Sequence, residues 1–459
     1  MEFIEEINGI INDLVWGAPA IILIMGVGLY MTLCLNFIQF KNWGFLIHNT
    51  YVKAFKKAQK DHESEGEISS FQAAMASVSA VVGSGNLAGV ATAIVSGGPG
   101  ALFWMEVAAI VGMATKFAEI FLGVKYREKA EDGSYVGGPM YYVAKGLHTP
   151  WLGKVISVLF LFFSVVISAV VDTNTISGAF EESLGINPTV TGVVLAGLCA
   201  IVIFGGITRI GEVCGLMAPF MAGVYILSGL MVIIMNISKV PEAVSLIITA
   251  AFNPESVMGG AAGITVMTVM RYGMARGIFS NEAGLGSAGV THAAAKVNDP
   301  AEQAIWGPLE VFVDTVIVCT ITGLTVVLGG LWKGDLDGVA LTMASFEKLL
   351  PGTFGKYMVL CVAALFGFSC LITFYNYMEK AWIHLFGPKT KMVAKAIWIV
   401  FILVGSQSTL GLVWDLADTC NGLIIIPNLI ALIFLSKEVV AGKESFFARE
   451  LPKYEASKK

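Results

Sequence analysis

Long apolar runs separated by short polar stretches make up most of the chain. A helix needs about 20 mostly apolar residues to cross a hydrocarbon core of roughly 30 Å. On that measure we predict eleven membrane spans, which run approximately from Gly17 to Ile38, Phe71 to Ser96, Ala101 to Val124, Val155 to Ala179, Val190 to Phe204, Gly211 to Met235, Gly259 to Ala288, Ile305 to Leu331, Tyr357 to Phe386, Val393 to Gly405 and Leu410 to Leu435. The pattern therefore predicts an all-α integral membrane protein.

Helix-start signals precede three of these spans. Ser69 and Gln72 have the spacing of a capping box, in which each side chain bonds the other residue's backbone N–H. Asn187 and Asp299 each stand directly before a proline, which is favoured at the first position of a helix. These signals predict where the three helices begin.

Composition supports a membrane protein and excludes several soluble classes. Hydrophobic residues make up 56% of the 459 residues and charged residues only 14%, whereas soluble domains carry roughly 25% charge. The sequence has no G-x-x-x-x-G-K-[ST], H-E-x-x-H or G-x-S-x-G pattern, so nothing indicates an ATP-driven pump or a protease. We expect no catalytic residues, no nucleic-acid partner and no obligatory protein partner, and a lipid bilayer around the chain.

The distribution of Lys and Arg predicts the orientation of the spans. Cytoplasmic loops carry an excess of these residues. If the N-terminus lies outside, most of the loop Lys and Arg fall on the inner side, and the outer side keeps only Lys239, Lys333, Lys348 and Lys356. We therefore predict a multi-pass protein of the cell membrane with its N-terminus outside and its C-terminus in the cytoplasm.

Two spans are glycine-rich and share an N-x-A-G pattern, at Asn86 in the second span and at Asn281 in the seventh. With the first span set aside, the other ten divide as five plus five, and the two patterns open halves of opposite membrane direction. This is the signature of an inverted repeat in a secondary transporter. We predict an extra helix and cytoplasmic linker (residues 1–68), two five-helix repeats (69–238 and 239–437) and a cytoplasmic tail (438–459).

The glycines at Gly83 and Gly85 predict a break in the second span. Unwound backbone is tolerated at membrane depth only where protein, solute or ion satisfies it. The half-helix after a break offers N–H groups to a carboxylate, and the half-helix before it offers carbonyls to a cation or an ammonium. The break thus has both poles that a zwitterion needs. The alternative is that the glycines only permit close helix packing.

Four stretches resemble the alanine or glycine:cation symporters, a family with the five-plus-five fold of the leucine transporter. They are GGPGALFWMEVAAIVGMATKFAE from Gly97, YVGGPMYYVAKGL from Tyr135, RGIFSNEAGLGSA from Arg276 and VGSGN from Val82. The resemblance covers nearly the whole chain. Glu106 departs from it, because the family usually has a tryptophan there, so the role of this position stays open.

The resemblance implies sodium-coupled symport of small neutral amino acids, chiefly alanine and glycine, by alternating access. Backbone around Gly83, Ser84, Gly85 and Asn86 would hold the substrate carboxylate, and the second break would supply the other wall with Gly277, Ile278, Phe279 and Ser280. Sodium, the coupling ion, would lie between carbonyls of Ser79 and Val82 and the hydroxyl of Ser369, with Thr373 as a further candidate.

Charged side chains inside spans are candidates for function because their burial is costly. Asp172, with Asn174, would either meet solute or make a contact between helices, and Arg271 and Arg276 would bind a carboxylate or belong to a structural ion-pair network. Lys116 and Glu119 are spaced i,i+3, and we expect them to pair near the inner surface. A proton path or a set of helix caps would be formed by Glu310, Asp314, Asp415 and Asp418.

Two alternatives to sodium symport remain at this point. One is a proton-coupled amino-acid permease. The other is a channel or passive facilitator whose glycine loops form a filter. Two unlike breaks suit alternating access better than a filter, and accumulation of solute against its gradient distinguishes a symporter from a channel.

Overall fold

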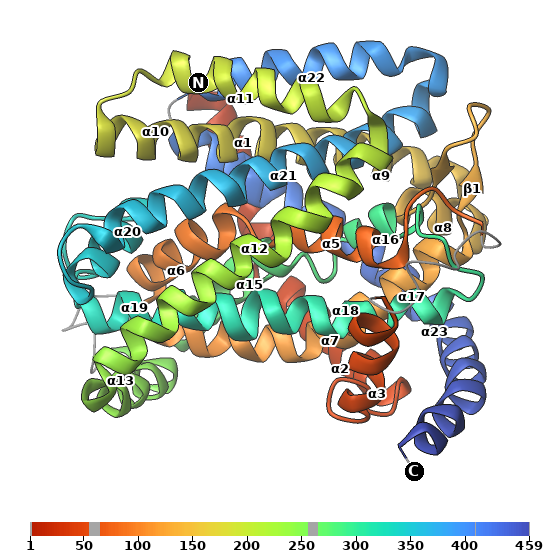
Figure 1. Ribbon diagram of the computed structural model, residues 1–459, viewed down its shortest axis with the longest axis horizontal. Coiled ribbons are helices and arrows are strands. Elements are labelled where there is room, and N and C mark those ends of the chain that lie inside the picture. Colours follow the sequence, from red (N-terminus) through yellow and green to blue (C-terminus); the bar gives the residue numbers. More distant parts are fainter. Residues whose placement is uncertain (1, 55–64, 256–264, 409, 459) are drawn as a thin grey trace.

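The computed structural model describes residues 2–54, 65–255, 265–408 and 410–458. It is a bundle of helices that run mostly along the longest axis of the molecule (Figure 1). One two-stranded antiparallel hairpin, β1 (Glu128–Lys129) with β2 (Tyr135–Val136), lies at the end of the bundle on the right of Figure 1. The prediction of an all-α fold is confirmed.

The helices of the first half lie, in sequence, within the predicted extra helix and first repeat. In chain order they are α1 (Glu2–Val15), α2 (Ala18–Cys34), α3 (Trp43–Ile47), η1 (His48–Val52), α5 (Ser70–Val81), η2 (Gly85–Gly89), α6 (Val90–Gly97), α7 (Gly100–Lys125), α8 (Pro139–Gly146), α9 (Pro150–Ser164), η3 (Val165–Asp172), α10 (Thr173–Leu184), α11 (Pro188–Ile203) and α12 (Gly206–Met235).

The second half of the chain likewise contains both long helices and interrupted helices. In chain order they are η4 (Ile237–Lys239), α13 (Val240–Phe252), α15 (Val266–Asn281), α16 (Ser287–His292), α17 (Pro300–Ala304), α18 (Trp306–Val311), η5 (Phe312–Cys319), α19 (Thr320–Gly329), α20 (Gly338–Leu349), α21 (Phe354–Phe386), η6 (Pro388–Thr390), α22 (Lys391–Gly405) and α23 (Leu410–Ser457).

Length and hydropathy identify seven helices of the described chain that are suited to cross a membrane, or eight if the bent pair α5 and η2–α6 counts as one span. Each of these overlaps one predicted span. The other three predicted spans correspond to α11, which is apolar but short, to α15 and to α22. The count of eleven and the division into two repeats therefore stay predictions.

The three helix-start signals are confirmed. Ser69 Oγ accepts from the N–H of Gln72, whose side chain accepts from the N–H of Ser69. Asn187 caps α11 by accepting from the N–H of Thr189, and Asp299 caps α17 by accepting from the N–H of Ala301, each ahead of a proline.

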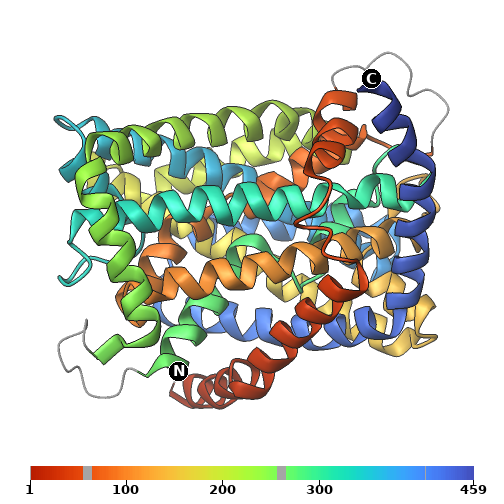
Figure 2. The same cartoon turned by 90° about the horizontal axis from the view of Figure 1, so that it is seen from below.

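Several short helices outside the spans, among them α8, α13 and α20, were not predicted from the sequence. Two of them, α13 and α20, lie together at one end of the bundle, on the left of Figure 1, and α8 lies at the other end beside the hairpin. α1 and the last turns of α23 lie at opposite corners in Figure 2. Helices α8, α13 and α20 are too short to span a bilayer. A search for long apolar runs therefore does not find them.

Helix α7 forms the centre of the bundle. In its most apolar window, 83% of the residues are buried inside the protein, and it packs against α15, α16 and α18. The backbones of α7 and α16 approach closely at Gly123 and Gly289, where a Cβ on either residue would collide with the other helix. α7 is therefore a rigid support for the interrupted helices.

Candidate functional site

The predicted break in the second span is present. α5 ends at Val81, and Val82 has φ −79° and ψ 86°, outside the helical region. The chain then turns through Gly83 and Ser84 into η2 and α6, and the two half-helices are bent by 42°. We call this turn the first break.

Asn86 closes part of the first break with its side chain. Its Oδ1 accepts from the N–H of Gly83 at 2.7 Å, and its Nδ2 donates to Asp314 of η5 at 2.7 Å. The Gly83 amide is therefore occupied, contrary to the expectation that it binds a substrate carboxylate. Within the described residues, the N–H groups of Ser84 and Gly85 have no backbone acceptor.

A buried carboxylate faces the first break from η3. Ser84 Oγ donates to Asp172 Oδ1, and Asp172 is 2% exposed. Its other oxygen, Oδ2, is buried and has no hydrogen-bond partner in the described structure. Of the two interpretations, the structure shows a contact between helices, because Asp172 of η3 bonds Ser84 of the first break. Asn174 donates to the backbone carbonyls of Gly405 and Ser408.

The second break lies farther along the chain than expected. α15 continues through Gly277, Ile278, Phe279 and Ser280 to Asn281. Positive φ angles then occur at 282 (57°), 284 (107°) and 286 (78°), before α16 begins. The prediction that residues 277–280 form the break is wrong, because the glycine at 277 serves helix packing: a Cβ there would lie 3.0 Å from Met105 Cγ of α7.

Two charged side chains of α7 satisfy the backbone of the second break. Lys116 Nζ donates to the carbonyl of Asn281 at 2.7 Å. Glu119 Oε1 accepts from the N–H groups of Gly284 and Gly286 at 2.8 and 3.0 Å. The spacing predicted that Lys116 and Glu119 pair with each other, but the structure does not form this pair. Each side chain is fully buried and bonds unwound backbone instead.

The first break and the last turn of α15 meet around Asp314. This carboxylate accepts from Asn86 of the first break and from Ser280 Oγ of α15 at 3.0 Å. The ring of Phe279 lies against the first break as well, since a Cβ on Gly85 would be 3.1 Å from it. Phe279 and Ser280 thus reach the first break, whereas Gly277 packs against α7 and Ile278 lies in the hydrophobic core.

Part of the predicted cation site is assembled. Ser369 Oγ of α21 lies 3.0 Å from the carbonyl oxygen of Ser79, in the last turn of α5. Thr373 lies one turn along α21, and its hydroxyl donates to the Ser369 carbonyl at 3.0 Å. Val82 lies at the break, and no hydrogen bond among the described residues joins it to Ser369 or Thr373.

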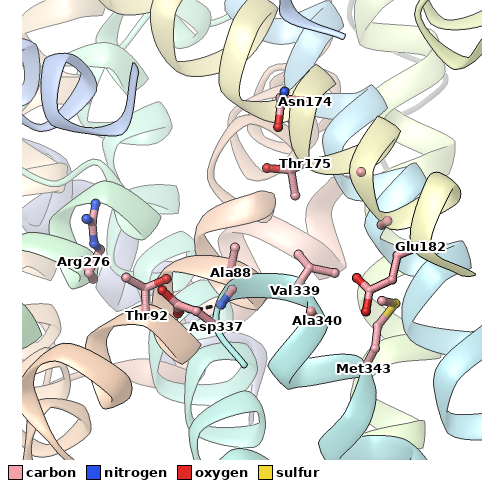
Figure 3. A pocket seen from close by; sticks show the side chains of 13 residues that line it. Ala88, Thr92, Asn174, Thr175, Glu182, Arg276, Asp337, Val339, Ala340 and Met343 are labelled. Carbon is pink, nitrogen blue, oxygen red and sulfur yellow. Dashed lines mark hydrogen bonds between the residues drawn. The ribbon is translucent and has the colours of Figure 1, made fainter. Parts of the chain in front are cut away.

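A cavity of about 440 Å³ lies between α6, α10, α15 and α20 (Figure 3). Arg276 of α15 lines it and pairs with Asp418 of α23 at 2.6 Å. Thr92 and Asp337 line the same side in Figure 3, and Glu182 the other. Arg276 is thus an ion-pair residue, as one interpretation predicted, but its partner is Asp418 and it borders a cavity.

The remaining charged candidates separate into different groups. Glu106 accepts from Thr320 at 2.9 Å, and Arg271 contacts Asn12 and Asp13 of α1. Glu310 bonds His292, apart from the Asp314 group. The side chain of Asp415 lies outside the described residues.

The roles of Lys116, Glu119 and Asp314 were missed by the sequence analysis. The sequence does contain one signal for them, namely a charged residue within an apolar span. Their partners are backbone groups and an amide on other spans, which no local spacing rule identifies.

A family model described as the sodium:alanine symporter family matches residues 1–458. This chain belongs to the sodium:alanine symporter family. The sodium/alanine symporter AgcS of Methanococcus maripaludis is 42% identical to it over 99% of each chain. The probable sodium/glutamine symporter GlnT of Bacillus subtilis is 36% identical over 98% of this chain and 95% of GlnT. The chain is therefore a cation-coupled amino-acid symporter of the membrane and not an enzyme.

The fold of this sodium:alanine symporter family member is also found in a solved transporter. The crystal structure of MhsT in complex with L-phenylalanine matches 83% of this chain and 93% of MhsT, with a TM-score of 0.61 and 14% identity. The likeness shows a shared leucine-transporter-type fold. The first break, which is the interrupted helix of that fold, is therefore the candidate site.

We predict that Lys116→Met lowers the thermal stability of this symporter. The Asn281 carbonyl would lose its donor at membrane depth, at a cost of about 1 to 3 kcal/mol. Lys125→Met is the matched control on the same helix, because Lys125 is exposed and forms its ion pair with Glu438, away from the second break. Unfolding in detergent, followed by intrinsic fluorescence, should give a lower midpoint for Lys116→Met alone. Equal midpoints for the two variants would contradict this role of Lys116.

Proposed function

We propose that this protein couples sodium entry to the uptake of small neutral amino acids, chiefly alanine and glycine. It works by alternating access in the cell membrane, with its N-terminus outside, its C-terminus in the cytoplasm and two five-helix repeats at 69–238 and 239–437. The observation that carries the proposal is the pairing of opposite poles at the first break. The N–H groups of Ser84 and Gly85, which have no backbone acceptor within the described residues, adjoin the buried carboxylate of Asp172.

A zwitterionic amino acid suits these two poles. Its carboxylate would accept from the N–H groups of Ser84 and Gly85, at the start of the half-helix that leads into α6. Its ammonium would donate to Asp172, whose Oδ2 is buried without a partner. An unpaired buried carboxylate oxygen is costly, so a bound ammonium would compensate it.

The proposed sodium position is the contact between α5 and α21. The carbonyl of Ser79 and the hydroxyl of Ser369 supply oxygen atoms there, and Val82 and Thr373 are the other proposed ligands. Carbonyls of unwound helix segments coordinate sodium in transporters of this type. The names of the relatives AgcS and GlnT also include sodium.

Proton coupling is the second candidate. Three fully buried carboxylates, Asp172, Glu282 and Asp314, surround the two breaks. Buried carboxylates of this kind form proton relays in some transporters. The ion that drives uptake must therefore be identified by experiment.

We predict that the purified protein in liposomes accumulates alanine and glycine when an inward sodium gradient is imposed at constant pH. The poles at the first break bind the zwitterion, and the sodium gradient supplies the energy. Uptake of labelled alanine above its equilibrium level measures this. Equal uptake with potassium in place of sodium would refute sodium coupling, and uptake driven by an imposed proton gradient would establish the second candidate.

Ser369→Ala should raise the sodium concentration for half-maximal uptake by about fivefold or more, since loss of a buried polar partner costs about 1 to 3 kcal/mol. The amides at the first break remain, so alanine affinity at saturating sodium should change less. Ser164→Ala is the control, because Ser164 is equally buried and bonds only the Phe160 carbonyl of its own helix. An unchanged sodium dependence would exclude Ser369 from the ion site.

Phe279→Ala should extend the substrate range toward valine and leucine. The Phe279 ring lies against Gly85, beside the N–H groups that bind the carboxylate, so it limits the space for a substrate side chain. Forcing a larger side chain into a filled site typically costs about 1 to 3 kcal/mol. Competition of labelled alanine uptake by a panel of amino acids tests this, with Phe204→Ala as the control, because Phe204 is exposed. An identical inhibition profile would show that Phe279 does not border the substrate.

A further inference from the structure

A buried cluster of polar side chains joins the two half-helices that lie on the hairpin side of the breaks, α5 and α16. His292, the last residue of α16, bonds Glu310 of α18 through Nε2 at 2.7 Å. Glu310 also accepts from Ser77 of α5 at 2.8 Å. His292 is 0% exposed and Glu310 is 1% exposed, so water does not reach the pair in this conformation.

The hydrogen bonds of Gln303 define which nitrogen of His292 carries the proton. The Gln303 amide accepts from Ser70 Oγ at 2.7 Å and donates to the Ser70 carbonyl at 3.2 Å, which fixes its orientation. Its Nε2 lies 2.6 Å from His292 Nδ1. An amide nitrogen only donates, so Nδ1 accepts and the ring is neutral with its proton on Nε2.

Protonation of His292 is incompatible with this arrangement. If Nδ1 takes a proton from water, it becomes a donor and faces the N–H of Gln303. Gln303 must then move away or turn its amide, and a turned amide loses the hydrogen bond to the Ser70 carbonyl. Ser70 is the first residue of α5. Proton uptake therefore loosens the start of α5.

The cluster lies next to the contacts that close this end of the molecule. The segment leading into α5 bonds the segment leaving α16: Lys296 N–H donates to the Ile68 carbonyl at 2.8 Å, and Glu67 N–H to the Ala294 carbonyl at 2.8 Å. Arg127 holds both segments, with bonds to the carbonyls of Glu65 and Ala295 among others. Opening this end must separate α5 from α16.

Apart from Tyr51, the titratable groups on neighbouring elements bond residues other than His292 and Glu310. Burial and the charge of Glu310 raise the pKa of Tyr51, in η1, to about 12, so Tyr51 stays neutral. On α7, Lys116 and Glu119 bond the second break, and on η5, Asp314 bonds Asn86. On α21, the contacts are Tyr377 with Glu282, Lys380 with Glu67 and Glu379 with Lys391. On α8, they are Lys145 with Glu128 and Tyr142 with Asn428. Within the described residues, His292 is thus the titratable partner of Glu310.

We propose that His292 is a proton-binding site that controls opening of the cytoplasmic end. The neutral ring locks α5 to α16 through Gln303 and Glu310. When the end opens, water reaches Nδ1, which binds a proton, and Glu310 balances the new charge. Because the proton binds the open state more tightly, cytoplasmic acid shifts the population toward that state. The inference rests on the alternating-access transport proposed above.

The test measures the opening directly in nanodiscs, without amino acid and at constant sodium. Spin labels are placed on Glu65→Cys, an exposed residue of the segment leading into α5, and on Lys389→Cys, in η6, after Cys34, Cys361 and Cys420 are replaced by serine. Between pH 8 and pH 5.5, the share of longer distances should rise about threefold or more, as expected for loss of one hydrogen bond. A share that does not change with pH would overturn the proposal.

Two variants separate His292 from other titrating groups. His292→Gln can still accept from Gln303 and donate to Glu310, so the distances should not respond to pH. His148→Asn removes an exposed histidine of the same end, at a positive φ that asparagine tolerates, and should leave the response intact. A response that persists in His292→Gln or disappears in His148→Asn would overturn the assignment.

A third variant covers the case in which His292→Gln fails to fold. Gln303→Met removes the amide through which the neutral His292 ring holds Ser70, so its share of longer distances at pH 8 should already match that of the parent at pH 5.5. An unchanged share at pH 8 would count against the proposal. Because these distances are measured without substrate, they are independent of the uptake experiment, and failure of sodium-driven alanine uptake would refute the proposed function alone.

Discussion

The structure depends on how backbone groups are satisfied where two helices break inside the membrane. Water cannot bond these groups at that depth, so protein side chains, ions or solute must do so. At the second break the partners are Lys116 and Glu119, which project from the central helix α7. Packing of α7, the positions of its charges and the course of the chain from 281 to 286 are therefore one arrangement.

The first break is satisfied less completely, and this difference distinguishes the two. Asn86 occupies the Gly83 amide, but within the described residues the N–H groups of Ser84 and Gly85 have no backbone acceptor and one oxygen of Asp172 has no hydrogen-bond partner. Buried polar groups without partners are costly in a low-dielectric interior. A solute that supplies a carboxylate and an ammonium removes that cost, so the first break, rather than the second, is suited to bind it.

The sequence was sufficient for the features that depend on local chemistry. The apolar runs, the caps at Ser69, Asn187 and Asp299 and the break after Val82 are each encoded within a few residues. The second break was misplaced because glycines at 277 and at 284 look alike in a sequence, although one packs against Met105 and the other turns the chain. Only tertiary contacts distinguish the two uses, and the same holds for the partner of Arg276.

The unequal attachment of the half-helices indicates which of them moves. α16 is held by the close backbone contact of Gly289 with Gly123, beside the bonds from α7 to the second break. The start of α5 is held by Gln303 and by a short backbone bridge near Ile68. Separating packed backbones exposes polar groups to lipid, whereas hydrogen bonds at the end of the bundle exchange with water at little cost. In the proposed opening of this end, we therefore expect α5 to move away from a stationary α16 and to carry the Ser79 carbonyl away from Ser369.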